Sequence, residues 1–227
     1  QTPITLRHLL THTAGLGYTI TQKGPLKEAY EAAGLVPARV SRLQIPALGT
    51  VKTVPTLTEF ADKLADMPLV YEPGTRFSYS VSLDLLGRII EVVSGQDFDA
   101  FLAERIFGPC GMTSTTFQVA AADAARLTSA YGIKDGTAVL VDPGATSVYL
   151  DRSAFPAGGA GLVSSPRDYD RFLMMLAGSG MIAGTRVMSE AAVRLGTSNL
   201  LPAGADLAGT WVAGAGYGAG GRVGLGA

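Results

Sequence analysis

The sequence is poor in cysteine, histidine and charged residues. It has one cysteine and two histidines among 227 residues, and Lys, Arg, Asp and Glu together make up only 16%. One cysteine cannot form a disulfide within the chain, and so few His and Cys residues argue against a zinc-type metal site. The formal net charge is −1 and no basic run occurs. Nucleic acid and anionic membrane surfaces are therefore not expected as partners.

Long apolar runs are also missing, so no membrane span is expected. The chain is 47% hydrophobic, which excludes a disordered protein, and it is long enough for one domain with a sizeable core. No repeat or linker divides it, so we expect a single domain over residues 1–227. A helix signal directly after Gln1 and a glycine-rich end at Ala227 indicate an internal piece, incomplete at both ends. Cytoplasmic and periplasmic locations stay open.

Capping residues followed by apolar stripes predict a mainly helical chain with short strands late in the sequence. Helices are expected from Thr5 toward Gly15, from Thr56 to Met67, over 83–93 with Gly95 as cap, over 98–106, from Ser165 to near Gly178, and from Ser189 to near Gly196. Residues 17–56 are expected to hold at most short helices. Residues 128–141 read as a hairpin with its turn at Asp135-Gly136.

Two common nucleophile motifs are absent. No Gly-x-Ser-x-Gly occurs, so the elbow of the α/β-hydrolases is missing, and no Ser-x-x-Lys occurs either. The segment Gly216–Gly221 does match Gly-x-Gly-x-x-Gly. A dinucleotide site needs a strand before that motif and a helix after it. In a tract this rich in glycine, a chance match is the better interpretation.

Tyr79 is the most informative residue that is present. It lies in the stretch Pro73–Val81 directly before a strongly helical run, and a turn of that kind can aim a phenol at a substrate. A free phenol has a pKa of about 10, but a neighbouring lysine ammonium favours the phenolate, which can then take a proton from a serine. A buried aromatic residue with its hydroxyl bonded is the alternative, and the local pattern leaves both open.

Four segments carry a family resemblance: Ile4–Leu16, Pro73-Gly74, Tyr79-Ser80-Val81 and Leu85-Leu86-Gly87. Together they resemble the serine β-lactamase and penicillin-binding-protein superfamily, in particular its class C branch and the related carboxylesterases. The resemblance implies an α+β fold of the β-lactamase/transpeptidase type, in which an antiparallel sheet is flanked by helices and joined to a helical region. It also implies acyl transfer through an acyl-serine, small-molecule ester or lactam substrates, and no cofactor.

The same resemblance assigns roles to individual residues. Tyr79 matches the catalytic tyrosine that activates the serine. Tyr18 matches the pocket edge, and Gly159 and Ala160 lie in a stretch placed near the acyl pocket. Val81 stands where β-lactamases carry an asparagine, and a valine has neither donor nor acceptor. This difference favours esters over β-lactams as substrates.

The resemblance also places two motifs outside the chain. The Ser-x-x-Lys nucleophile motif is expected before Gln1 and the Lys-Thr-Gly-type motif after Ala227, because Lys134-Asp135-Gly136 comes too early. His8 and His12 are interpreted as buried or capping residues rather than as bases. Three functions remain open: a carboxylesterase, which Val81 favours; a β-lactamase or D-Ala-D-Ala carboxypeptidase; and a non-catalytic penicillin-binding-protein-like relative. The oligomeric state is not predicted.

Overall fold

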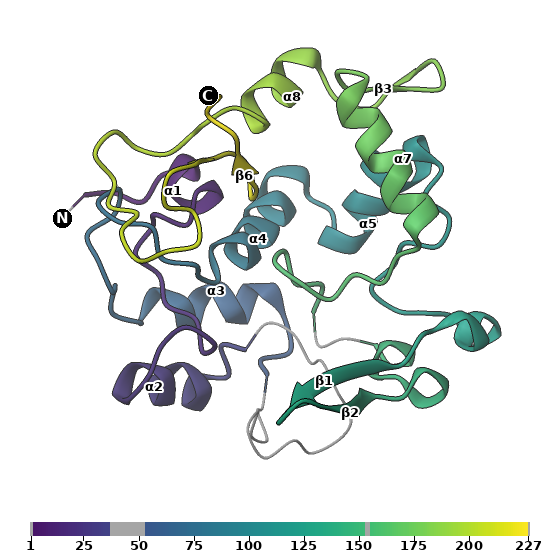
Figure 1. The fold of residues 1–227 in the computed structure, drawn as a ribbon, viewed down its shortest axis with the longest axis horizontal. Helices are drawn as coiled ribbons and strands as arrows, with labels where there is room; N and C mark the ends of the chain where they lie inside the picture. The colour runs from purple at the N-terminus through teal and green to yellow at the C-terminus, as the bar shows by residue number, and fades with distance from the viewer. Residues whose placement is uncertain (1, 37–52, 153–154, 227) are drawn as a thin grey trace.

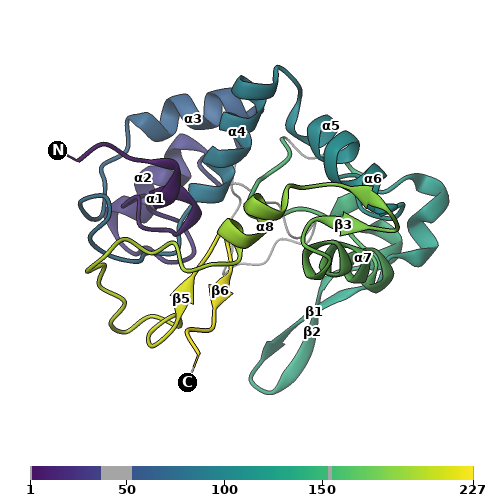
Figure 2. The same cartoon turned by 90° about the horizontal axis from the view of Figure 1, so that it is seen from above.

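The computed structural model describes residues 2–36, 53–152 and 155–226 (Figure 1). Figures 1 and 2 show two halves. Helices α1 to α4 form one half, and helices α5 to α7 with a β-hairpin form the other. Helix α8 lies between them, and the strands β5 and β6 lie beside the first half.

The helices have the following bounds: α1 Leu6–Leu10, α2 Pro25–Ala33, α3 Leu57–Ala65, α4 Ser82–Ser94, α5 Phe98–Leu102, α6 Gly108–Cys110, α7 Pro166–Ala177 and α8 Glu190–Gly196. A π-helical turn at Ala103–Phe107 joins α5 to α6, and short 3₁₀ turns occur at Ala121–Arg126, Gly144–Thr146 and Val148–Leu150. The strands are β1 Ala130–Lys134, β2 Thr137–Asp142, β3 Met181–Ile182, β4 Thr185–Arg186, β5 Gly216–Tyr217 and β6 Arg222–Val223.

Side-chain caps start four of these helices. The hydroxyls of Thr5, Thr56, Ser165 and Ser189 each accept a hydrogen bond from the backbone N–H three residues later. This bond satisfies one of the free N–H groups at a helix start. Gly95 ends α4 in the left-handed conformation, with φ of 70°. The helices predicted from these caps are confirmed.

The described strands form three two-stranded antiparallel sheets. The predicted hairpin is β1–β2, and its turn residues Asp135 and Gly136 have φ of 50° and 75°, as a tight hairpin requires. The glycine-rich segment Gly216–Gly221 runs from β5 toward β6. No helix follows it in the described part of the chain, so it lacks the context of a dinucleotide site.

The largest core cluster joins α2, α3 and α4. Phe60 of α3 is fully buried and packs on Phe155, with ring centroids 5.4 Å apart. A second cluster joins α6, α7 and β3 and contains Cys110, which is buried as expected. A third cluster holds Phe77, Val212 and Tyr217. It connects the stretch before α4 with the end of the chain, which the sequence separates widely.

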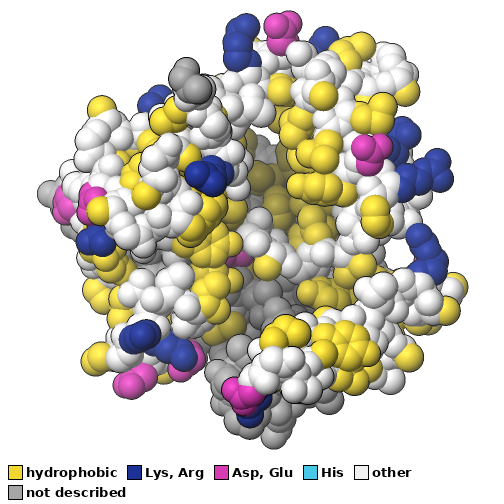
Figure 3. Space-filling view, in the orientation of Figure 1, with side chains coloured by type: hydrophobic (Ala, Val, Ile, Leu, Met, Phe, Trp, Pro, Cys, Tyr) yellow, Lys and Arg dark blue, Asp and Glu magenta, His cyan; other side chains and the backbone are white. Residues whose placement is uncertain are grey.

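The surface is hollowed between α4 and α7, and hydrophobic side chains gather along the α7 side of the hollow (Figure 3). Among the described residues, no helix has both the length and the apolar character needed to cross a membrane.

Candidate functional site

Tyr79 lies at the end of an extended stretch, three residues before the first residue of α4, and its side chain is half-buried. The backbone on both sides of it is fixed. The N–H of Ser78 donates to the carbonyl oxygen of His12 at 2.8 Å, and the N–H of Ser80 donates to Nδ1 of His12 at 3.2 Å. The carbonyl of Tyr79 itself accepts from the Thr21 hydroxyl at 3.2 Å. The phenol is therefore held by its backbone, as the sequence pattern predicts.

Two other tyrosines lie close to Tyr79. The Tyr18 ring is 5.9 Å from the Tyr79 ring, and burial, with help from Asp84 and Tyr79, raises the pKa of Tyr18 to about 12. Burial and the nearby Tyr79 likewise raise the pKa of Tyr217 to about 12. Both neighbours therefore stay protonated at neutral pH, and their hydroxyls can donate hydrogen bonds beside Tyr79.

The aromatic contacts continue away from Tyr79. Phe77 packs edge-on against Tyr217 at 5.2 Å and against Trp211 at 6.0 Å between ring centroids. Trp211 is 57% exposed and lines a cavity of about 430 Å³ together with Arg76, Phe77 and Tyr79. Sequence analysis missed Trp211 and Tyr217, because they follow Tyr79 by more than a hundred residues and only the fold brings them together.

His12 is 1% exposed, and burial lowers its pKa to about 4, so its ring is neutral at physiological pH. Its ring centroid lies 4.6 Å from that of Tyr79. Its Nε2 atom is buried and has no hydrogen-bond partner in the described part of the structure. His12 also has φ of 53°, a left-handed conformation that is uncommon outside glycine but that histidine adopts more often than most residues.

His8 has a capping role at the start of α1. Its Nδ1 accepts from the Thr5 N–H at 3.3 Å, while its own N–H donates to the Thr5 hydroxyl at 3.2 Å, which closes a cap at the start of α1. Within the described residues, neither His8 nor His12 is hydrogen-bonded to a carboxylate. The interpretation of both histidines as buried or capping residues is confirmed.

The turn at residues 156–161 lies directly on the first turn of α4. Asp84, which is 2% exposed, accepts a hydrogen bond from the Gly159 N–H at 3.0 Å. A Cβ atom on Gly158 would lie 2.0 Å from the Leu83 carbonyl oxygen, so only glycine allows this approach. Burial raises the pKa of Asp84 to about 6. Sequence analysis missed Asp84, which looks like an ordinary first-turn acid of a helix.

The structure thus brings Tyr79, Tyr18 and Gly159 to the N-terminal end of α4. Ala160 follows Gly159 and is half-buried. Val81 lies at the N-cap position of α4, and its side chain is fully buried in the largest core cluster. The catalytic role of Tyr79 and the substrate contacts of the other four residues stay predictions.

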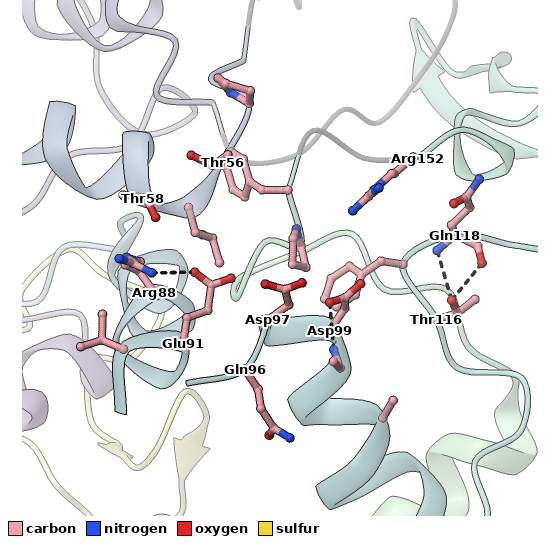
Figure 4. A pocket seen from close by; sticks show the side chains of 18 of the residues that line it. Thr56, Thr58, Arg88, Glu91, Gln96, Asp97, Asp99, Thr116, Gln118 and Arg152 are labelled. Carbon is pink, nitrogen blue, oxygen red and sulfur yellow. Dashed lines mark hydrogen bonds and ion pairs between the residues drawn. The ribbon is translucent and has the colours of Figure 1, made fainter. Parts of the chain in front are cut away.

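A larger cavity, of about 1050 Å³, lies at the other end of α4 (Figure 4). Its polar lining includes Arg88 and Glu91, which form an ion pair at 3.2 Å, and the exposed acids Asp97 and Asp99. None of the predicted site residues lines it. Among the described residues, no group of three or more His, Cys, Asp and Glu side chains is arranged to hold a metal ion.

A family model described as Beta-lactamase matches residues 1–226. The chain belongs to the beta-lactamase family. Protein Rv1367c of Mycobacterium tuberculosis is a family relative that is 33% identical over 192 residues, which cover 85% of this chain and 43% of that protein. Esterase EstB of Burkholderia gladioli is 32% identical over 185 residues, which cover 75% of this chain and 43% of that protein.

Solved structures give the same fold. EstCE1, described as a hydrolase with promiscuous acyltransferase activity, superimposes with a TM-score of 0.73 at 26% identity, over 97% of this chain and 56% of that one. Unliganded simvastatin synthase LovD from Aspergillus terreus superimposes with a TM-score of 0.70 at 27% identity, over 99% of this chain and 54% of that one. The β-lactamase/transpeptidase-like fold is therefore confirmed. The chain spans less than half the length of these two curated relatives, 43% in each case.

Proposed function

We propose that this chain is part of a serine hydrolase that acts through an acyl-serine intermediate, most favourably on short acyl esters. Tyr79 is its general base, and the nucleophile is a serine in a Ser-x-x-Lys motif outside this chain. The observation that carries the proposal is the fixed, half-buried Tyr79 phenol between His12 and Tyr18 at the start of α4. The proposal is further supported by membership of the beta-lactamase family.

The chemistry follows from what a serine needs. Its hydroxyl is a weak acid, so attack requires a base that accepts the proton as the Oγ–carbonyl bond forms. In the proposal the oxygen of Tyr79 takes that proton and passes it to the leaving alcohol when the ester C–O bond breaks. Water then attacks the acyl-serine carbonyl carbon while Tyr79 takes a proton from it, and Tyr79 returns that proton to the serine Oγ as the acyl–Oγ bond breaks and the acid is released.

Esters are proposed as the substrates because residue 81 offers no polar group. Val81 is buried, and its side chain has no donor or acceptor for a β-lactam side chain. Two of the similar proteins are described as an esterase and as a hydrolase with acyltransferase activity. A β-lactamase or D-Ala-D-Ala carboxypeptidase is the second candidate, which the family model supports. A non-catalytic relative is the third, and the tests below separate it from both.

The first test replaces Tyr79 by phenylalanine in the full-length protein. Tyr79→Phe keeps the ring and removes the proton acceptor, so kcat on a p-nitrophenyl ester should fall by about 10²–10⁴-fold. Tyr131→Phe is the matched control, because that tyrosine is 62% exposed on the β1–β2 hairpin. Turnover near the wild-type value in Tyr79→Phe would show that another residue is the general base. An inactive wild-type protein would favour the non-catalytic alternative.

A second test locates the nucleophile. A fluorophosphonate probe should label the full-length protein at one serine outside residues 1–227, because no serine of this chain is followed three positions later by lysine. The labelled peptide is identified by mass spectrometry. A stoichiometric label on any serine within the chain would contradict the proposed mechanism.

A further inference from the structure

We propose that His12 is a positioning residue that holds Tyr79 in its reactive orientation. It does so as a neutral imidazole that accepts a hydrogen bond through Nδ1. This inference rests on the proposed function of Tyr79. It assigns to His12 neither a contact with the substrate nor a proton transfer.

His12 holds the backbone on both sides of Tyr79. Its carbonyl oxygen accepts from the Ser78 N–H at 2.8 Å, and its Nδ1 accepts from the Ser80 N–H at 3.2 Å. Ser78 and Ser80 are the two neighbours of Tyr79 in the chain. One residue therefore fixes the peptide planes that determine where the phenol points.

The His12 ring is packed among aromatic side chains. The imidazole lies 4.6 Å from the Tyr79 ring at an interplanar angle of 43°, and it meets the edges of Phe77 and Tyr217 at 5.9 and 5.8 Å. With three aromatic rings around it and a 1% exposed side chain, His12 has no room to rotate. It forms a rigid support for one side of the Tyr79 ring.

His12 is kept in place although its ring leaves a buried polar atom without a partner among the described residues. Its left-handed backbone, with φ of 53°, is uncommon outside glycine, although histidine adopts it more often than most residues. Since Nδ1 accepts from Ser80, the ring proton is on Nε2, and this buried donor has no partner among the described residues. Strain of this kind persists where the surrounding structure needs the geometry, and it is concentrated at functional sites.

The test compares two substitutions of His12 in the full-length protein. His12→Asn keeps an acceptor near the Nδ1 position and tolerates the left-handed backbone. His12→Phe keeps a ring but leaves the Ser80 N–H without a partner. His8→Asn is the matched control, because the His8 ring nitrogen accepts from the Thr5 N–H at the start of α1.

On a p-nitrophenyl ester, kcat of His12→Phe should fall by about 10–100-fold while KM changes by less than about threefold, because a misplaced catalytic group lowers turnover rather than ground-state binding. His12→Asn should restore most of that loss, and His8→Asn should match the wild type. A folded His12→Phe protein with wild-type kcat, or a His12→Asn protein as slow as His12→Phe, would overturn the inference.

The failure of this inference can be told apart from failure of the proposed function. If Tyr79→Phe is slow and a folded His12→Phe is not, only the role of His12 is wrong. If Tyr79→Phe has normal turnover, both the role of Tyr79 as general base and the positioning role of His12 are wrong. Should His12→Phe not fold, ¹⁵N NMR of the wild-type histidine rings decides. The expected result is an unprotonated Nδ1 on His12 that is coupled to the Ser80 N–H, and a proton on Nδ1 would overturn the proposal.

Discussion

A single buried carboxylate, Asp84, sets the electrostatics of this site. It accepts from the Gly159 N–H, and no Lys or Arg of the described residues forms an ion pair with it. Burial raises its pKa from 3.8 to about 6, so the folded protein binds this proton more tightly than the unfolded chain does. The resulting stability is fully present below about pH 4 and is lost as pH rises through 6. The loss amounts to about 3 kcal/mol.

Replacing Asp84 by asparagine should therefore change the pH dependence of stability. Asp84→Asn keeps an oxygen for the Gly159 N–H and removes the buried charge. Relative to the wild type, its melting temperature should rise progressively between pH 4 and pH 7. Asp62→Asn, on an exposed position of α3, controls for the loss of one negative charge. A melting-temperature difference between Asp84→Asn and wild type that stays constant over this range would contradict the burial argument.

At the scale of elements, the close contact between α4 and the turn at 156–161 fixes the position of that turn beside the site. Gly158→Ala would force a Cβ against the Leu83 carbonyl oxygen, 2.0 Å away, so the turn must move off the helix. We expect a loss of about 1–3 kcal/mol in stability, the usual cost of overpacking, with lower esterase turnover. Gly221→Ala is the control, because a Cβ there meets no atom within 4 Å. Equal melting temperatures for the two variants would show that the turn is free to shift.

Elements with a local signal in the sequence, such as a capping side chain, an apolar stripe or an Asp-Gly turn, were the ones that could be predicted. Thr56 and Ser165 mark their helices because a hydroxyl bonded to a backbone N–H is a local signal. Helix α2 has Gly24 at its N-cap position and so lacks a side-chain cap, and β3–β4 has only two residues per strand, too few to show an alternation. The same distinction between local and tertiary signals holds for the site residues. Tyr79 has a local signature, but Tyr217 and Trp211 join it only through tertiary packing.

The whole molecule assembles the site from four distant stretches: residues 12–18, 77–84, 158–160 and 211–217. We expect the full-length protein to turn over a p-nitrophenyl ester with a higher kcat/KM than a chromogenic cephalosporin. Each hydrogen bond that Val81 cannot offer to a β-lactam side chain is worth about 0.5–1.5 kcal/mol. Both substrates are compared under the same conditions, and a better rate on the cephalosporin would favour the β-lactamase alternative.

The β1–β2 hairpin has a consequence for how the protein opens. Both strands are largely exposed, with Tyr131 at 62% and Ile133 at 76%. The hydrogen bonds between the two strands therefore provide most of the stabilisation of the hairpin. A two-stranded hairpin is only marginally stable by itself. Its amide hydrogens should therefore exchange with deuterium long before those of α3 and α4, through opening that leaves the rest of the molecule folded. Brief trypsin digestion should accordingly cut after Lys134, the exposed last residue of β1 beside the turn, before it cuts within α3 and α4.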